Sequence, residues 1–289
     1  MHNVSSATAR QTTGFSLIEL IVVMVVVGIL AGIVAVFIRS PMEGYMATSR
    51  RAELTDTADG ALLRIARDVR TALPNSLRMT QVGTAIYLEY LPSEGGGRYR
   101  EQRDSTADCT DPATAGCDIL DFTLADTKFD VLGSPVDITG AHYLVIYNLG
   151  LPDADVWAGD NYSPLEAANS SCTVSGCSTL AFSSFQFPLE SPSHRFYIAS
   201  KPVSYVCAPN TDGTGTLTRY ANYSDHPTTD QLTIELSSGD LLANHVATCS
   251  FTYEPGASQR VGQLTLRIQL SQDGETVTLY REVVVNNDA

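Results

Sequence analysis

The sequence predicts an α+β protein, with one long N-terminal helix followed by a mostly antiparallel β-sheet domain. Apolar residues run without a charge from Leu20 to Ile38 and then recur at helical spacing as far as Leu73. Beyond Pro74 apolar and polar residues alternate, as they do in strands with one buried face. Six cysteines, all in the later part of the chain, add disulfide-bearing loops to this prediction.

Composition and charge restrict the function of the chain. It has 289 residues, and the roughly 215 that follow the predicted helix are enough to bury a core. The part up to Arg103 carries 11 basic and 9 acidic residues, whereas the remainder carries 7 basic and 23 acidic ones. Since phosphates are neutralised by Lys and Arg, we expect no nucleic-acid partner.

The apolar run is long enough for a membrane-spanning helix. As an α-helix it spans roughly 28 Å, about the thickness of a bilayer core. Residues 1–14 form a predicted leader that carries Arg10 and no acid. In an ordinary secretory signal the small residue at the cleavage site follows the apolar run, whereas Gly14 precedes it.

The order Gly-Phe-Ser-Leu-Ile-Glu-Leu at residues 14–20, followed by the apolar run, resembles the type III signal of type IV prepilins and type II secretion pseudopilins. The resemblance implies a pilin-like fold, cleavage by a prepilin peptidase between Gly14 and Phe15, and methylation of the new Phe15 amine. It also implies that the partners are other pilins of the same filament and an inner-membrane assembly platform.

Two features of the apolar segment suit contact with other helices. A carboxylate in a bilayer costs on the order of 2.5–3.5 kcal/mol, and the resemblance implies that Glu19 pairs with the terminal amine of a neighbouring subunit. The alternative is an interfacial Glu19 stabilised by the helix dipole. Only the pairing predicts that Glu19→Val blocks assembly while membrane insertion survives. Gly28 and Gly32 fit either close helix packing or a locally softened helix.

The second half of the helix is predicted to be amphipathic and to lie on the sheet. Its apolar stripe recurs at three- and four-residue steps: Ala58, Ala61, Leu62, Ile65, Val69 and Leu73. The charged residues predicted to face away are Arg64, Arg67, Asp68 and Arg70. Arg64 can reach Asp68 one turn further on. Ser40-Pro41 should break or kink the helix, and Pro74-Asn75 should end it.

These boundaries divide the chain into four predicted segments: a leader 1–14, a transmembrane and assembly helix 15–40, an amphipathic continuation 41–74, and an extracytoplasmic β-rich domain 75–289. The predicted strands are 85–91, a segment around Tyr99, 143–147, 195–199, 203–207, 215–220, 246–253, 263–270 and 276–283. Asp273-Gly274 predicts a hairpin turn between the last two strands. Gly95-Gly96-Gly97 is predicted as a hinge, and 104–118 and 149–179 as loops.

Spacing favours three disulfides among the many possible pairings: Cys109–Cys117, Cys172–Cys177 and Cys207–Cys249. An even number of cysteines behind a membrane segment indicates an oxidising compartment. A zinc site is the alternative, but there is no Cys-x-x-Cys and the later histidines show no ligand spacing: His142, His194, His226 and His245.

The second half of the chain extends the resemblance. The arginine-rich helical stretch 62–70 and a C-terminal β domain resemble the larger minor pilins and the J-type minor pseudopilin. The stretches 195–207 and 241–251 are similar to the O-subunit of mannose-sensitive haemagglutinin (MSHA) pilus biogenesis.

No catalytic motif is present, so we expect a protein that is not an enzyme and has no cofactor. Calcium is the one alternative, on two groups of oxygen-bearing residues: Asp153, Asp155 and Asp160 around Trp157, and the stretch 210–213. Neither group matches an EF-hand loop, so solvated turns are favoured. Trp157 is predicted to lie in the core beneath a loop.

Three functions remain open: a minor pilin of an MSHA-like type IV pilus, a J-type minor pseudopilin of a type II secretion system, and a membrane-anchored binding module. Arg39, Arg50 and Arg51 follow the apolar run and only Arg10 precedes it, which by the positive-inside rule favours a cytoplasmic C-terminal side. Long domains cross largely regardless of charge, and the cysteines favour the outside. We therefore expect a single-pass protein of the bacterial inner membrane with a periplasmic C-terminal domain, which later enters a pilus at the cell surface.

Overall fold

The computed structural model describes residues 14–110, 114–221, 223, 238–255 and 260–289. The predicted leader, apart from Gly14, lies outside the described residues, and so do Arg10 and His226. The chain divides into two compact units, Met1–Arg50 and Arg51–Ala289.

Helix α1, Leu17–Val69, begins in the first unit and ends in the second. Ser40 and Pro41 are both helical, so the break predicted there does not occur. Proline removes one N–H from the helix ladder and can bend a helix, but the bonds of the residues on either side remain available.

The helix ends at Val69, earlier than the predicted end at Pro74. The N–H of Ala72 turns back to the carbonyl oxygen of Val69 at 3.1 Å, a tightened last turn. The N–H of Leu73 then donates to the carbonyl oxygen of Leu91 at 2.7 Å. A contact with a segment distant in sequence therefore ends the helix before the proline does.

Seven strands form the first sheet, in the spatial order β1-β2-β10-β11-β12-β13-β14 with every pair antiparallel. Their bounds are β1 Arg78–Val82, β2 Ala85–Tyr90, β10 Val203–Ala208, β11 Gly215–Ala221, β12 Asp240–Glu254, β13 Val261–Gln272 and β14 Glu275–Asn286. The predicted hairpin is confirmed, because Gln272 pairs with Glu275 and the two turn residues Asp273 and Gly274 have φ of 49° and 82°.

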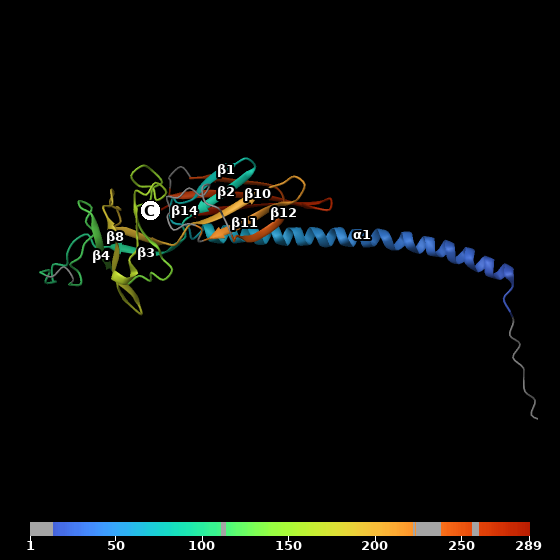
Figure 1. Ribbon diagram of the computed structural model, residues 1–289, viewed down its shortest axis with the longest axis horizontal. Helices are drawn as coiled ribbons and strands as arrows, with labels where there is room; N and C mark the ends of the chain where they lie inside the picture. The colour runs from blue at the N-terminus through green and yellow to red at the C-terminus, as the bar shows by residue number, and fades with distance from the viewer. Residues whose placement is uncertain (1–13, 111–113, 222, 224–237, 256–259) are drawn as a thin grey trace, which may run out of the picture. The chain divides into compact units, whose positions relative to one another are not determined.

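Another seven strands form the second sheet, in the order β6-β5-β9-β3-β4-β8-β7. Figure 1 labels β3, β4 and β8 of this sheet. Their bounds are β3 Ser93–Tyr99, β4 Asp126–Leu132, β5 Tyr143–Ile146, β6 Tyr162–Pro164, β7 Ser171–Thr173, β8 Gly176–Phe185 and β9 Arg195–Ala199. A 3₁₀ turn, η1, occupies Ala167–Asn169. The α+β architecture is thus confirmed, with two sheets in place of the one predicted.

Two predictions fail in the second sheet. The glycines at 95–97 lie inside β3 rather than in a hinge. A Cβ on Gly97 would come within 2.9 Å of the Phe196 ring, so the neighbouring strand needs glycine there. The predicted loop 149–179 contains β6, β7 and the start of β8. The first two strands have three residues each, which is too short to produce a visible period.

The second half of α1 packs on the first sheet (Figure 1). Every residue of the predicted apolar stripe is buried. The helix contributes Leu54, Leu62, Ile65 and Val69 to a core shared with sheet residues that include Leu88, Tyr205, Leu217, Leu264 and Ile268. Each fully buried aliphatic side chain of this kind contributes about 1.5–3 kcal/mol, so the stripe anchors this part of the helix.

The second sheet has an aromatic core of its own, formed by Tyr99, Phe129, Phe182, Phe187 and Phe196 with aliphatic neighbours. A third, smaller cluster joins Leu73 and Leu91 to residues of the second sheet, among them Tyr143, Val145 and Ala199. The loop that follows α1 is thereby packed against the second sheet.

All six cysteines are paired, as Cys109–Cys117, Cys172–Cys177 and Cys207–Cys249, the same pairs that spacing favours. Cys172 and Cys177 lie directly opposite each other on β7 and β8. Cys207 and Cys249 link β10 to β12 across a sequence separation of 42 residues.

Candidate processing and assembly segment

The predicted cleavage site lies in an exposed stretch before α1. Gly14, Phe15 and Ser16 precede the helix and are exposed, Phe15 by 79%. A peptide bond must leave regular structure and be accessible before a peptidase can cut it. Within this chain the bond between Gly14 and Phe15 meets both conditions.

Glu19 lies in the first turn of α1. The hydrogen bonds of its backbone N–H show that Ser16 is the N-cap of the helix. The N–H of Glu19 donates to the Ser16 carbonyl oxygen at 3.1 Å and to Ser16 Oγ at 3.3 Å. Serine followed three residues later by glutamate is the capping-box pattern, and an acid here is favoured by the helix dipole. This cap was not among the predicted features, although the spacing of Ser16 and Glu19 is visible in the sequence.

The Glu19 carboxylate has no hydrogen bond or ion pair with any residue that the structure describes. The backbone of Glu19 is therefore satisfied inside the chain, whereas its carboxylate has no partner among the described residues. This leaves the carboxylate free to meet a group of another molecule.

The helix beyond Glu19 is apolar and uncovered. The stretch Leu17–Ala35, 19 residues long, is long and apolar enough to cross a membrane, and none of it is buried within the chain. Its exposed side chains include Leu20, Met24, Ile29 and Ile33. An apolar stretch of this length requires lipid or other apolar helices around it.

The two glycines of this segment are also uncovered. A Cβ built on Gly28 or Gly32 would meet no atom within 4 Å. Neither glycine is needed for packing within the described chain. Because Gly28 and Gly32 have no side chain, a second helix can approach the backbone closely at this point.

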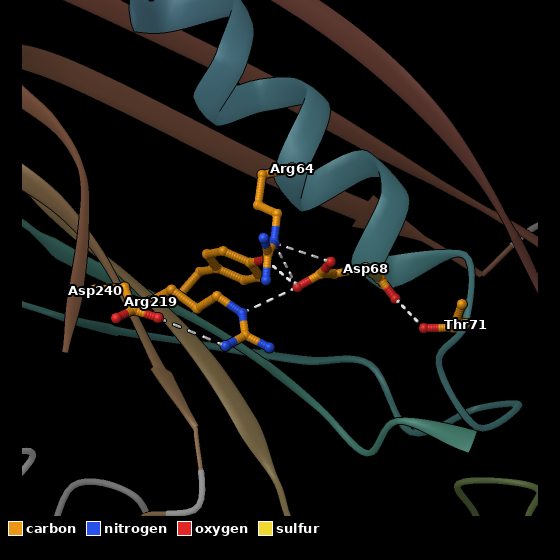
Figure 2. A network of polar contacts seen from close by, with 6 residues as sticks. Arg64, Asp68, Thr71, Arg219 and Asp240 are labelled. Atoms are coloured by element: carbon orange, nitrogen blue, oxygen red, sulfur yellow. Dashed lines mark hydrogen bonds and ion pairs between the residues drawn. The ribbon is translucent and has the colours of Figure 1, made fainter. Parts of the chain in front are cut away.

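Asp68, in the second half of α1, does not face away as predicted. Tyr205 Oη donates to Asp68 Oδ2 at 2.6 Å and Arg219 Nε donates to the same oxygen at 3.0 Å. Arg64 approaches the other oxygen from one turn earlier, at 3.3 Å, which confirms the predicted pair (Figure 2). Asp240 lies on the far side of Arg219, at 4.0 Å. Polar contacts thus fix the helix to β10 and β11.

The electrostatics of this network favour the charged aspartate. Burial raises the pKa of Asp68, but the hydrogen bonds from Tyr205 and Arg219 and the charge of Arg64 together bring the pKa below its usual value. Burial raises the pKa of Tyr205, and its bond to Asp68 raises it further, so the phenol remains a donor at neutral pH.

The oxygens considered for calcium cap local turns. Asp160 Oδ2 accepts from the N–H of Asp153 at 3.1 Å, and Asp155 Oδ1 accepts from the N–H of Trp157 at 2.9 Å. Asp212 likewise accepts from its neighbour Thr214. Within the described residues, no three His, Cys, Asp or Glu side chains form a group that could hold a metal ion.

Trp157 is half-buried at the edge of the third hydrophobic cluster, in line with its predicted place in the core. Its indole Nε1 donates to the carbonyl oxygen of Ser76 at 2.9 Å. The guanidinium of Arg78 lies 3.8 Å from the centre of its ring, in a cation–π contact. These contacts give Trp157 a structural role.

Comparison with known proteins adds one finding. Residues 10–35 match the family model described as the prokaryotic N-terminal methylation motif. No curated protein matches the chain. No solved structure matches it either.

The matched range includes Gly14, Phe15, Glu19 and the apolar helix as far as Ala35. The motif supports a type IV pilin-like or pseudopilin protein and points to a structural subunit rather than an enzyme. It implies processing by a prepilin peptidase and assembly with other pilins in general. The apolar helix at the N-terminus is consistent with a single-pass membrane anchor.

Proposed function

We propose that this protein is a minor pilin, a structural and assembly subunit of a type IV pilus. The single observation that carries the proposal is the methylation motif at residues 10–35, which includes the apolar stretch Leu17–Ala35, none of it buried within the chain. In this proposal the peptidase cuts after Gly14, Phe15 is methylated, and the helix anchors the subunit in the inner membrane with its β domain in the periplasm. The same helix then enters the filament.

Glu19 is the proposed assembly residue, because its carboxylate has no partner among the described residues. Pairing with the methylated amine of a neighbouring subunit would neutralise a charge that costs about 2.5–3.5 kcal/mol in lipid. We expect Glu19→Val to remain in the membrane fraction and to disappear from sheared fibres. The matched control is Glu43→Val, an exposed acid of the same helix outside the apolar run.

Equal amounts of Glu19→Val and unaltered protein in the fibres would contradict the assembly role. Loss of both variants from the fibres, with both still in the membrane, would show that any charge change on this helix blocks assembly, and it would contradict the specific pairing as well.

The MSHA subtype is the finer part of the proposal. It rests on the similarity of residues 195–207 and 241–251, which include β9, β10 and most of β12. Mass spectrometry of sheared fibres tests it: pilins of the MSHA type should co-purify with this subunit, and pilins of another pilus type alone would contradict it.

The second candidate is a J-type minor pseudopilin, which is favoured by the same motif and by the same amphipathic helix. The two candidates differ in where the β domain ends up. An antibody against the β domain should label intact cells if the protein is a pilin. Labelling only after the outer membrane is opened would support the pseudopilin and contradict the pilin.

We propose that the subunit functions without a cofactor. The aspartates considered for calcium already accept hydrogen bonds from nearby residues of the chain. A chelator should therefore leave the melting temperature of the β domain unchanged. A fall in Tm with EDTA that calcium restores would overturn this part of the proposal.

A further inference from the structure

A shallow cleft on the second sheet carries two arginines. Its volume is about 500 Å³, and it lies over β3 and β9 beside the end of β4. The polar residues that line it are Arg98, Ser134, Arg195 and Tyr197. The volume of the cleft lies within the range of about 300–1,000 Å³ that is typical of small-molecule sites.

Strand register places the two arginines side by side. Arg98 on β3 pairs directly with Arg195 on β9, and Gly96 pairs with Tyr197. Directly opposed residues of antiparallel strands project from the same face of the sheet. The alternate residue Phe196 is buried in the aromatic core, so the arginines lie on the face away from that core. Like charges in this arrangement destabilise the sheet unless an anion lies between them.

Among the residues that the structure describes, an anion accompanies only one of the two arginines. Arg195 Nη1 lies 3.2 Å from Asp288 Oδ2, and Tyr197 Oη donates to the Asp288 carbonyl oxygen at 2.8 Å. The Arg98 side chain is exposed, and its guanidinium forms no hydrogen bond or ion pair within the part of the chain that the structure describes. Glu94 lies on the same face of β3, but it is outside the lining of the cleft.

Gly96 keeps the floor of the cleft open. A Cβ at this position would collide with the carbonyl oxygen of Phe196 and lie 3.4 Å from the Tyr197 ring. A side chain is therefore excluded between Arg98 and Tyr197. A glycine inside a strand often marks a place where a ligand or another backbone comes close.

We propose that this cleft binds a carboxylate-bearing sugar of about one ring, of the uronic acid class. Paired guanidinium groups match a carboxylate in charge and geometry. The Tyr197 ring offers an apolar surface to a sugar ring, and the Ser134 hydroxyl offers a hydrogen-bond partner. The chain carries a net charge of −14, and Asp288 already pairs with Arg195, so the guanidinium of Arg98 is the charge that makes this cleft a selective place for an anion.

The cleft lies entirely in the second unit and involves neither Phe15 nor Glu19. The proposal therefore does not depend on the pilin function, and its success or failure leaves that function unaffected.

Titration calorimetry on the full-length protein in detergent tests the proposal, with D-glucuronate as the probe and D-glucose as its neutral counterpart. We expect glucuronate to bind and glucose not to bind. Arg98→Gln should weaken glucuronate binding at least tenfold, because it removes a cation whose side chain has no partner among the described residues. The matched control is Arg267→Gln, an exposed arginine of β13 in the first sheet, which should bind as the unaltered protein does.

Absence of glucuronate binding would overturn the proposal, and so would equal affinity in Arg98→Gln and the unaltered protein. Inorganic phosphate is the third probe. Phosphate binding as tight as that of glucuronate would reduce the cleft to a general anion site and overturn its assignment to sugar acids.

Discussion

The two halves of α1 are one helix in two different environments. In the first half, Leu17–Ala35, every apolar side chain is exposed within the chain. In the second half, one apolar stripe is buried against the first sheet and the opposite face is charged. Apolar surface must be removed from water. The second half finds its partner within the chain, whereas the first half requires a partner outside it.

The carboxylates of the two halves differ in the same way. Asp68 accepts hydrogen bonds from Tyr205 and Arg219, both on the first sheet. Glu19 has no such partner among the described residues. Asp68 therefore serves the stability of the second unit, and Glu19 is available for assembly. Substitutions in the second unit should change folding, and substitutions in the first unit should change insertion or assembly.

The largest expected effect comes from a disulfide of the second unit. Cys207 and Cys249 are separated by 42 residues, whereas Cys172 and Cys177 are separated by 5. Because a longer closed loop constrains the unfolded chain more, removing the first pair by double Ala substitution should cost about 4 kcal/mol and removing the second about 2 kcal/mol. Urea unfolding followed by circular dichroism measures both losses.

Both double variants should still insert into the membrane, because the first unit contains no cysteine. Equal losses for the two pairs, or a failure of insertion, would contradict the separation of the two units' roles.

The next effect compares matched isoleucines in the two halves of α1. Ile65 is completely buried against the first sheet, whereas Ile29 is 59% exposed. Ile65→Ala should lower the free energy of unfolding of the β domain by about 3 kcal/mol, through lost burial and the cavity that remains. Ile29→Ala should leave that free energy unchanged. Similar losses for both variants in urea unfolding would erase the distinction between the halves.

The smallest expected effect concerns Asp68 and depends on pH. Asp68→Asn should cost about 1–2 kcal/mol at pH 7, because charge-assisted hydrogen bonds to Tyr205 and Arg219 are weakened. Since the folded-state pKa of Asp68 is lowered, its stabilisation is fully present above the unfolded pKa of about 4. It disappears as the pH falls through the folded value.

Unfolding curves at pH 7 and pH 2 test this sign. The difference between the unaltered protein and Asp68→Asn should be larger at pH 7 than at pH 2. The control is Asp56→Asn, an exposed aspartate on the same helix, which should show no difference at either pH. A larger difference at pH 2 than at pH 7 would contradict the lowered pKa.

The sequence predicts features that are encoded by neighbours in the chain. Helical spacing predicts the buried stripe from Ala58 to Val69, and Asp273-Gly274 predicts its hairpin turn. The signal at residues 14–20 identifies the processing segment, which the family model also matches. The Ser16 cap is also encoded locally, by a serine that is followed three residues later by Glu19.

The features that escaped prediction depend on partners distant in the sequence. Helical spacing places Asp68 on the solvent side of the helix, but Tyr205, 137 residues later, and Arg219 bind its carboxylate. Glycines 95–97 look like a hinge until β9 pairs with them. The pairing of Arg98 with Arg195 requires strand register, which no local pattern contains.

Mass spectrometry of the mature N-terminus tests the central claim most directly. The full-length protein is expressed with a prepilin peptidase, isolated from membranes and digested. We expect an N-terminal peptide that begins at N-methylated Phe15, which means that the mature chain keeps the helix that starts at Leu17. A chain that keeps residues 1–14, or one that is cut beyond residue 38, would contradict it.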